Sequence, residues 1–334
     1  MIVDALEAVA AAGVPFAFRG EQPLDGPPPG GDVDILVGSR DLHRAERALT
    51  AAGFRRLHAA GQRGHRFYLA FHRGRWIKLD INVVPRRLGW DLSARDPQHQ
   101  ALFAGYRITP QAHDGGLGRV GAAWARRRPL ALRRRGAVIA LLGPDGAGKG
   151  SVASALEEQV PIAISRHYLG EGDRANRHGT SRPETQRVRA RQAPVGLREA
   201  QHVARKALRS CWRVLWPGYA RAWRGEIVIF DRHPIEVLAV RPSRTPLGGA
   251  VERLLARHLI PWPDALVVLD APGDVLYARK GEHTPDVLER WRRGYLDEFG
   301  PRGAAVVSTL DGLERTVGET SAVVWEALSR RRGW

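Results

Sequence analysis

The residues with the clearest chemical potential lie in the segment AVIALLGPDGAGKGS at 137–151. Its Gly143, Gly148 and Lys149 have the GxxxxGK spacing, directly after an apolar run and before a helical pattern. Glycines let backbone N–H groups wrap a polyphosphate, the N-terminus of the next helix adds a positive dipole, and the lysine reaches the β- and γ-phosphates. The segment therefore predicts an ATP-binding loop, whose cofactor-binding residues are Gly143, Gly146, Gly148, Lys149, Gly150 and Ser151.

Gly150 departs from the usual pattern, in which a Ser or Thr at this place is a ligand of Mg²⁺. Ser151 follows one place later, so we expect Ser151 near the ion and water as most of the ion's ligands. Asp231 is a second candidate ligand, because it ends the apolar run IVIF at 227–230. At the carboxyl end of a buried strand it is placed to organise Mg²⁺ and water or to accept a hydroxyl proton, with Arg232 beside it.

Three motifs in this part of the chain resemble, in the same order, the thymidylate kinase branch of the nucleoside monophosphate kinases. They are GPDGAGKGS, FDRHP at 230–234 and LDAPGDVLYARKGEHTPDVLERWRRGYLDEF at 269–299. The resemblance implies ATP and Mg²⁺ as cofactors, Asp145 near the acceptor sugar and Arg232 on the acceptor phosphate. It also implies an arginine-rich lid over the donor, for which the candidates are Arg279, Lys280, Arg290 and Arg293. Lys149, Asp231, Arg232, Asp145, Arg279 and Arg290 are therefore the expected catalytic residues.

A separate set of carboxylates stands near the N-terminus. GDVDILV at 31–37 places Asp32 and Asp34 on one face of a strand, since side chains two apart point the same way. WIKLDINVV at 76–84 adds Asp80 among apolar residues. Three carboxylates on neighbouring strands suit a two-metal site that aligns a nucleoside triphosphate with a hydroxyl.

With FRG at 18–20, this region resembles the nucleotidyltransferase fold of the aminoglycoside-modifying and related enzymes, over about residues 1–92. The resemblance implies that Asp32 and Asp34 hold metal ions and that Asp80 is the third ligand and the base. Gly20 and Glu21 stand where that family usually has Gly-Gly or Gly-Ser. A carboxylate at Glu21 repels the phosphates of a donor, which argues against activity there.

The elements that must position these residues fall into two patterns. Strand-like runs upstream surround a helical stretch at 42–52, which predicts a small α/β unit; the runs are 16–18, 33–37, 67–71 and 76–83. Downstream, fully apolar runs alternate with helical patterns, which predicts a parallel sheet covered on both faces by helices. These runs are 137–142, 227–230, 265–269 and 304–307. The fold class is α/β in both parts.

The chain carries 52 basic and 35 acidic residues, and two segments concentrate the excess. Residues 119–136 hold seven basic and no acidic residues, so we place a basic linker there, between domains at 1–118 and 137–334. Residues 166–224 hold 14 basic and four acidic residues and include a Trp-containing helical pattern at 198–223. This basic interval favours an anionic acceptor, such as a nucleotide or a sugar phosphate. Docking of both segments on nucleic acid or an anionic membrane, or plain packing of the Trp residues on the core, are the alternatives.

The composition narrows the class of protein. A single Cys excludes a disulfide framework, and no apolar run reaches the roughly 18 residues of a membrane span, so a cytoplasmic protein is expected. The leading hypothesis is an ATP-dependent phosphotransferase. The alternatives are a nucleotidyltransferase that uses Asp32, Asp34 and Asp80, and a nucleotide-gated binding module. A homodimer is left open.

Overall fold

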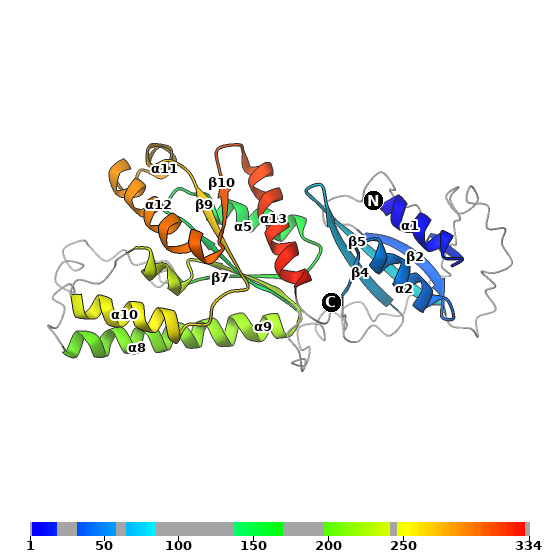
Figure 1. The fold of residues 1–334 in the computed structure, drawn as a ribbon, viewed down its shortest axis with the longest axis horizontal. Coiled ribbons are helices and arrows are strands. Elements are labelled where there is room, and N and C mark those ends of the chain that lie inside the picture. Colours follow the sequence, from blue (N-terminus) through cyan, green and yellow to red (C-terminus); the bar gives the residue numbers. More distant parts are fainter. Residues whose placement is uncertain are drawn as a thin grey trace, which may run out of the picture. The chain divides into compact units, whose positions relative to one another are not determined.

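Two β-sheets organise the part of the chain that the computed structural model describes, which comprises residues 2–18, 32–57, 65–84, 136–169, 197–240 and 246–330 (Figure 1). The chain divides into two units, one built on strands β1–β5 and the other on strands β6–β10. Of the predicted linker at 119–136, only Gly136 lies within the described residues, so the linker stays a prediction. No helix in the described ranges is both long and apolar enough to span a membrane.

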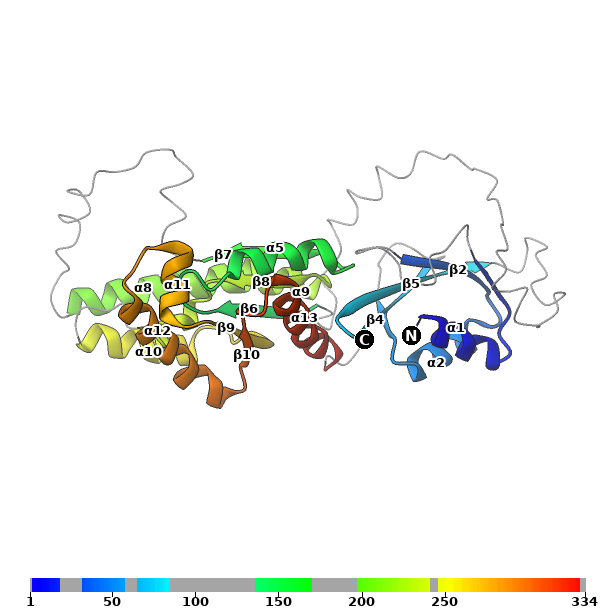
Figure 2. The same ribbon diagram turned by 90° about the horizontal axis from the view of Figure 1, so that it is seen from above.

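The first unit is a mixed sheet in the order β1-β2-β5-β4-β3, with two helices on one face (Figure 2). β2 runs parallel to β5, and the other neighbours are antiparallel. Alternate residues of β2 are fully buried and share a core with both helices, so polar residues between them lie on the opposite face. The elements are α1 (Ile2–Ala11), β1 (Phe16–Phe18), β2 (Asp32–Gly38), α2 (Leu42–Ala51), β3 (Arg55–Leu57), β4 (His65–His72) and β5 (Arg75–Val84).

The second unit has a parallel five-stranded sheet in the order β10-β9-β6-β8-β7. Figure 2 shows helices on both of its faces, as the apolar runs predicted. Every residue of β6 and β8 is buried, as expected for central strands of a covered parallel sheet. The strands are β6 (Val138–Leu142), β7 (Ile164–Tyr168), β8 (Ile227–Asp231), β9 (Ala265–Asp270) and β10 (Ala305–Ser308).

The helices of this unit connect the strands and frame the carboxyl ends of β6 and β8. They are α5 (Lys149–Gln159), α8 (Leu197–Arg213), α9 (Ala220–Trp223), α10 (Pro246–His258), α11 (Gly273–Lys280), α12 (Pro285–Phe299) and α13 (Leu313–Ser329). A π-helical turn, η3 (Val214–Tyr219), joins α8 to α9. A Cβ at Gly218 in this turn would lie 2.4 Å from Phe230 Cζ of β8. The turn therefore needs a glycine to pack closely on the central strand.

The edge strand β7 was not among the apolar runs that predicted the sheet. Of its five residues, only Ser165 is buried, and Arg166 and Tyr168 are exposed. An edge strand with polar outward residues lacks the continuous apolar signal of a central strand. Its position beside β8 brings Arg166 to the strand ends where the site lies.

Candidate functional site

The loop between β6 and α5 has the backbone geometry of a phosphate cradle. Gly143, Gly146 and Gly148 have φ angles of 137°, 86° and 83°, which disfavour residues with a Cβ. A Cβ at Gly143 would lie 2.7 Å from the carbonyl oxygen of Leu269, and one at Gly146 would lie 2.5 Å from that of Leu276. Gly143 and Gly146 therefore let the loop pack against β9 and α11, and the loop leads directly into the N-terminus of α5.

Lys149 begins α5 and folds back over this loop. Its Nζ donates hydrogen bonds of 2.6 Å and 2.9 Å to the carbonyl oxygens of Gly143 and Pro144. Burial lowers the pKa of the ammonium group. The nearby carboxylates of Glu236, Asp145 and Asp231 oppose this decrease in the pKa. The amino group of Lys149 thus lies at the loop, where the β- and γ-phosphates of a nucleotide would lie.

The predicted Mg²⁺ ligands can be tested against this geometry. Asp231, at the end of β8, accepts a 2.9 Å hydrogen bond on Oδ2 from Nη2 of Arg166. Gly150 supplies no hydroxyl, and a Cβ there would lie 3.2 Å from the same Nη2. Ser151 is exposed on the first turn of α5. The usual pair of a hydroxyl and a free carboxylate is therefore not present, and a guanidinium stands in the space between Gly150 and Asp231.

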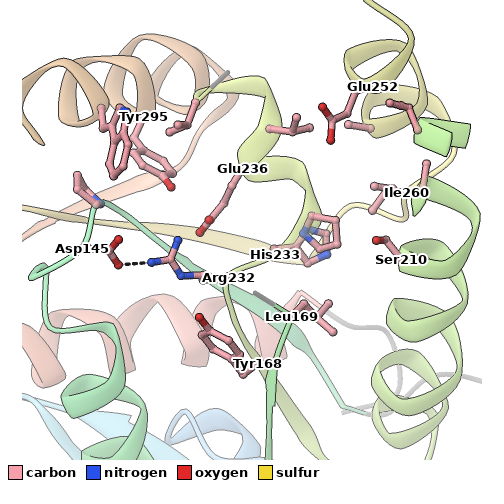
Figure 3. A pocket seen from close by; sticks show the side chains of 18 of the residues that line it. Asp145, Tyr168, Leu169, Ser210, Arg232, His233, Glu236, Glu252, Ile260 and Tyr295 are labelled. Carbon is pink, nitrogen blue, oxygen red and sulfur yellow. Dashed lines mark hydrogen bonds and ion pairs between the residues drawn. The ribbon is translucent and has the colours of Figure 1, made fainter. Parts of the chain in front are cut away.

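A second ion pair joins the loop to the end of β8. Arg232 hydrogen bonds to Oδ1 of Asp145 through Nη2, as the dashed line in Figure 3 marks. Lys280 Nζ lies 3.7 Å from the same oxygen, and His283 Nε2 lies 3.9 Å from Oδ2. Arg232 has a φ of 65°, in the left-handed region that a bulky residue rarely adopts. Asp145 thus lies among basic side chains. The backbone of one of them, Arg232, is strained.

A cavity of about 440 Å³ opens beside this ion pair (Figure 3). Pro144 and Asp145 of the loop line it, together with Arg232 and residues of α8, η4 (Pro234–Leu238), α10 and α12. Most of the other described lining residues are apolar or aromatic: Tyr168, Leu169, Val203, Ala207, Val237, Val240, Ala256, Ile260, Trp291 and Tyr295. A volume of this size suits a small molecule. The cavity therefore presents a small molecule to the phosphate loop.

Glu236 is the most perturbed acid of this cavity. Burial raises the pKa of Glu236 to about 7, against the attraction of Lys149 and Arg232, which favour the ionised form. In Figure 3 its side chain points toward Arg232. Neighbouring His233 caps η4, where Nδ1 accepts the Ile235 N–H at 3.3 Å, and burial lowers the pKa of His233 to about 3. His233 is thus a neutral structural residue, whereas Glu236 changes its charge near neutral pH.

The expected lid arginines differ in their contacts and in their exposure to solvent. Arg279 donates to Oγ1 and to the carbonyl oxygen of Thr309, both at 2.8 Å, so it ties α11 to the end of β10. Arg290 is exposed on α12, and Arg293 pairs with Glu289 at 3.2 Å on the same helix. The structure therefore gives Arg279 a structural contact, and the donor-binding role of Arg279 and Arg290 stays a prediction.

The described part of the basic interval, residues 166–169 and 197–224, contributes mainly uncharged side chains to the cavity. On α8, the residues that line the cavity are Val203, Ala207 and Ser210. The arginines of the same helix at 205, 209 and 213 are exposed. Among the described lining residues, Asp145, Glu236 and Glu252 oppose the single guanidinium of Arg232. The lining that the structure describes therefore does not favour the strongly anionic acceptor expected from the sequence.

The carboxylates of the first unit meet as the strand pattern predicted. Asp34 of β2 lies directly opposite Asp80 of β5 in the parallel register. Asp34 accepts from Asn82 Nδ2 at 3.4 Å, and Asp80 Oδ2 lies 2.8 Å from His65 Nδ1. Burial raises the pKa of Asp80 to about 6, and Asp34 adds to the rise, while His65 opposes it. The side chain of Asp32 lies outside the described residues, so its predicted role remains untested.

Sequence reasoning missed three functional candidates: Arg166, Glu236 and His65. Arg166 and His65 each contact a carboxylate that lies far along the chain, and burial raises the pKa of Glu236. A local sequence motif shows neither such contacts nor burial. The position of Glu236, two residues after the His-Pro pair that follows Arg232, was the available signal. A carboxylate in an otherwise apolar stretch (PIEVLAV) behind a strand end is a candidate acid or base.

Comparison with solved structures finds similar chains, one of which is described here. The chain is similar to the crystal structure of a thymidylate kinase from Ehrlichia chaffeensis, with a TM-score of 0.37 and 17% sequence identity over 57% of this chain and 98% of that chain. No protein-family model matches the sequence. No curated protein matches it either.

Proposed function

We propose that the second unit is an ATP-dependent phosphotransferase, built on the three motifs that resemble those of the nucleoside monophosphate kinases. It would move the terminal phosphoryl group of ATP from the loop at 143–151 to a small molecule in the adjoining cavity. The observation that carries the proposal is the shared wall: Pro144 and Asp145 belong to the loop and also line the cavity. Phosphoryl transfer requires mainly alignment and positive charge around the transferring group. The shared wall aligns the cavity with the loop, and Lys149 and Arg232 supply the positive charge beside it.

The residues divide the work as follows. The glycine-rich loop and Lys149 hold the β- and γ-phosphates. Arg232 lies at the boundary of loop and cavity, where negative charge develops on the transferring group. Glu236, with a pKa of about 7, accepts the proton of an attacking hydroxyl, because a base is most effective when its pKa is near the working pH. The ligand pair usual for Mg²⁺ is incomplete at Gly150 and Asp231, so no step is assigned to the ion.

The acceptor that fits the described lining carries a hydroxyl on an apolar or aromatic body, without a strong negative charge. The described wall has three carboxylates and one guanidinium, and Tyr168, Trp291 and Tyr295 offer flat surfaces to a ring. A phosphate group deep in this wall would meet more negative than positive charge. Nucleosides and similar hydroxylated ring compounds are therefore better candidates than nucleotides or sugar phosphates.

A substrate screen tests the proposal. Purified full-length protein is incubated with ATP and either nucleosides or the matching monophosphates and sugar phosphates, and ADP and pyrophosphate are followed separately. We expect ADP to form with neutral hydroxylated acceptors at a higher kcat/KM than with their phosphorylated counterparts. Preference for the monophosphates would overturn the acceptor class and restore the anionic acceptor. Absence of ADP with every acceptor would overturn the phosphotransferase itself.

The first unit supports a second candidate activity, nucleotidyl transfer. Asp34 and Asp80 lie opposite each other on parallel strands, and Asp80 Oδ1 has no hydrogen-bond partner among the described groups. A buried carboxylate oxygen beside a second carboxylate suits a divalent cation, which would orient a triphosphate and activate a hydroxyl. Release of pyrophosphate in the same screen, lost in Asp34→Asn, supports this activity. Pyrophosphate that persists in this variant contradicts it.

A further inference from the structure

One face of α8 and η3 exposes large apolar side chains to solvent. The exposed fractions are 59% for Leu208, 64% for Trp212, 43% for Leu215 and 65% for Trp216. Their spacing of four, seven and eight residues from Leu208 places them along one side of the helix. The rings of Trp212 and Trp216 stack on each other, with centroids 5.9 Å apart and planes 5° from parallel. These four residues form a continuous apolar stripe, here called the α8 stripe.

The opposite face of the same helix is firmly packed. Val203, Ala207 and Val214 are buried, and Cys211 donates through Sγ to the carbonyl oxygen of Leu259 at 3.3 Å, just after α10. The helix therefore stays attached to its unit while the stripe faces outward. Exposed clusters of large apolar residues on a well-packed helix mark an interaction surface.

Positive charge accompanies the stripe. Arg205, Arg209 and Arg213 are exposed on the same helix, and the sequence has no Asp or Glu between Glu199 and Glu226. Tryptophan, leucine and arginine together are typical of helices that lie in the interface of an anionic lipid bilayer. Leu208 and Leu215 offer aliphatic surface that suits acyl chains, and neither has a flat face on which a base could stack. A second copy docked on this face would bring two rows of arginines together.

We propose that the α8 stripe docks the protein on an anionic lipid surface. The tryptophans and leucines enter the boundary between headgroups and acyl chains, and the arginines contact the anionic headgroups. Apolar burial and charge attraction both contribute to such binding, so removal of either weakens it. The helix lies along the surface and does not cross the bilayer.

Co-sedimentation with vesicles tests this docking. The full-length protein is mixed with vesicles of phosphatidylcholine alone or of phosphatidylcholine with phosphatidylserine. We expect at least about ten-fold tighter binding to the anionic vesicles, reduced at high salt. Trp212→Ser with Trp216→Ser, and separately Arg205→Glu with Arg209→Glu, are each expected to weaken it about ten-fold or more. Two matched controls leave it unchanged: Leu254→Ser with Leu310→Ser, and Arg47→Glu with Arg315→Glu, all exposed elsewhere.

Several results would overturn the docking proposal. The proposal is contradicted if the protein binds both kinds of vesicle equally, or if both stripe variants bind as tightly as the wild type. Binding of single-stranded RNA that the stripe variants lose, without vesicle binding, assigns the surface to nucleic acid instead. Dimerisation in analytical ultracentrifugation that the tryptophan variant abolishes assigns it to a second copy. Circular dichroism of each variant establishes that it is folded before any result is counted.

A second, independent observation concerns Arg166 in the phosphate site. Its Nη2 bonds to Asp231 at 2.9 Å, and its Nη1 donates to Ser154 Oγ at 3.3 Å. The absence of a side chain at Gly150 leaves the room that this guanidinium uses, since a Cβ there would lie 3.2 Å from it. A guanidinium has five donors, so Arg166 keeps donors for the oxygens of a phosphate.

We infer, on the basis of the proposed phosphotransferase, that Arg166 takes the place and the positive charge of the divalent cation between the loop and Asp231. Gly150, which has no side chain, and Arg166, whose guanidinium lies beside it, then complement each other in this site. The bound triphosphate is held by the loop N–H groups, Lys149 and Arg166. Its affinity should depend little on Mg²⁺.

Calorimetric titration with ATP tests this substitution apart from turnover. For the wild type, we expect the Kd in EDTA and in Mg²⁺ to agree within about three-fold, and Arg166→Ala to weaken binding about ten-fold or more in EDTA. In Gly150→Ser with Arg166→Ala, which restores the hydroxyl and frees Asp231, Mg²⁺ should tighten binding about ten-fold. A wild type that binds only with Mg²⁺, or an Arg166→Ala variant that binds as the wild type does, overturns the inference. Absence of ADP formation with ATP still bound contradicts only the phosphotransferase.

Discussion

The two units both bring carboxylates close together, and the groups that face these carboxylates differ. In the second unit, Asp231 at the end of β8 pairs with Arg166, and Asp145 in the phosphate loop pairs with Arg232. In the first unit, Asp34 and Asp80 lie opposite each other on parallel strands, and His65 contacts Asp80. A guanidinium stays charged at every ordinary pH. Two neighbouring carboxylates repel each other when both are ionised, which favours a shared proton or a bound cation.

This difference separates two kinds of site. The second unit has a preorganised set of guanidinium–carboxylate pairs, beside which Glu236 of the cavity has a pKa of about 7. The first unit has a site whose charge depends on pH and on the ions present, because Asp80 titrates near pH 6. The guanidinium groups suit the binding of a polyphosphate, whereas the site in the first unit suits a bound metal ion.

The largest effect is expected from removing the lysine at the phosphate loop. Lys149→Ala should lower kcat for ADP formation about 10²- to 10³-fold, because the ammonium group stabilises charge that develops during transfer. Steady-state kinetics measures the loss, and Lys280→Ala, an exposed lysine 3.7 Å from Asp145, is the matched control with a smaller effect. Turnover equal to that of the wild type would remove the loop from the proposed mechanism.

Glu236→Gln should have the next largest effect, a fall in kcat of about 10- to 10²-fold. In the wild type, kcat should decline as the pH falls below about 7, because the base becomes protonated. The variant should lose this dependence, since glutamine does not titrate. Glu252→Gln changes another carboxylic acid of the cavity wall, and this variant should keep the pH dependence of kcat. A pH profile with the same inflection in Glu236→Gln would assign the proton acceptor elsewhere.

Asp80 makes the stability of the first unit depend on pH. Its folded pKa of about 6 exceeds the ordinary value of 3.8, so its contribution to stability is present below pH 4 and is lost as the pH rises through 6. With allowance for solvent screening, the loss is about 1 to 2 kcal/mol. Calorimetric unfolding in EDTA should show that the difference between the wild type and Asp80→Asn changes by this amount between pH 4 and 7. A constant difference would mean that Asp80 is paired by a cation at every pH.

The smallest effect tests whether the two sites act separately. Asp32→Asn with Asp34→Asn should leave the rate of ADP formation within about two-fold of the wild type, because the two sites belong to separate units and sites that share no partners usually behave independently. The same variant should lose any pyrophosphate release. A collapse of ADP formation in a folded double variant would mean that one composite site uses both sets of carboxylates.

The sequence predicted those parts of the fold that rest on local patterns. β6 and β8 are buried on both faces, so their apolar runs marked them, and the GxxxxGK spacing marked the loop between β6 and α5. Alternation along β2 placed Asp34 on the polar face, where it meets Asp80. The edge strand β7 was missed because its outward residues are polar. The periodicity of apolar residues in a sequence reflects burial, and an edge strand has few buried residues.

The partners of the charged groups were beyond the reach of sequence patterns. Arg166 and Asp231 are 65 residues apart, and Arg232 and Asp145 are 87 apart, so only the sheet order brings them together. The sequence left the role of the basic interval open; in its described part, the arginines of α8 at 205, 209 and 213 are exposed, while Val203, Ala207 and Ser210 line the cavity. Composition gives the sign of a segment's charge, but it does not say which face of a helix carries that charge.

The left-handed backbone of Arg232 has a consequence for the stability of this chain. A bulky residue at a φ of 65° costs about 1 kcal/mol or more, which glycine would avoid. Arg232→Gly should therefore relieve conformational strain while it removes a guanidinium from the cavity wall. The same change would also remove the ion pair with Asp145, so the strain at this position and the charge pair it supports act on stability in opposite directions.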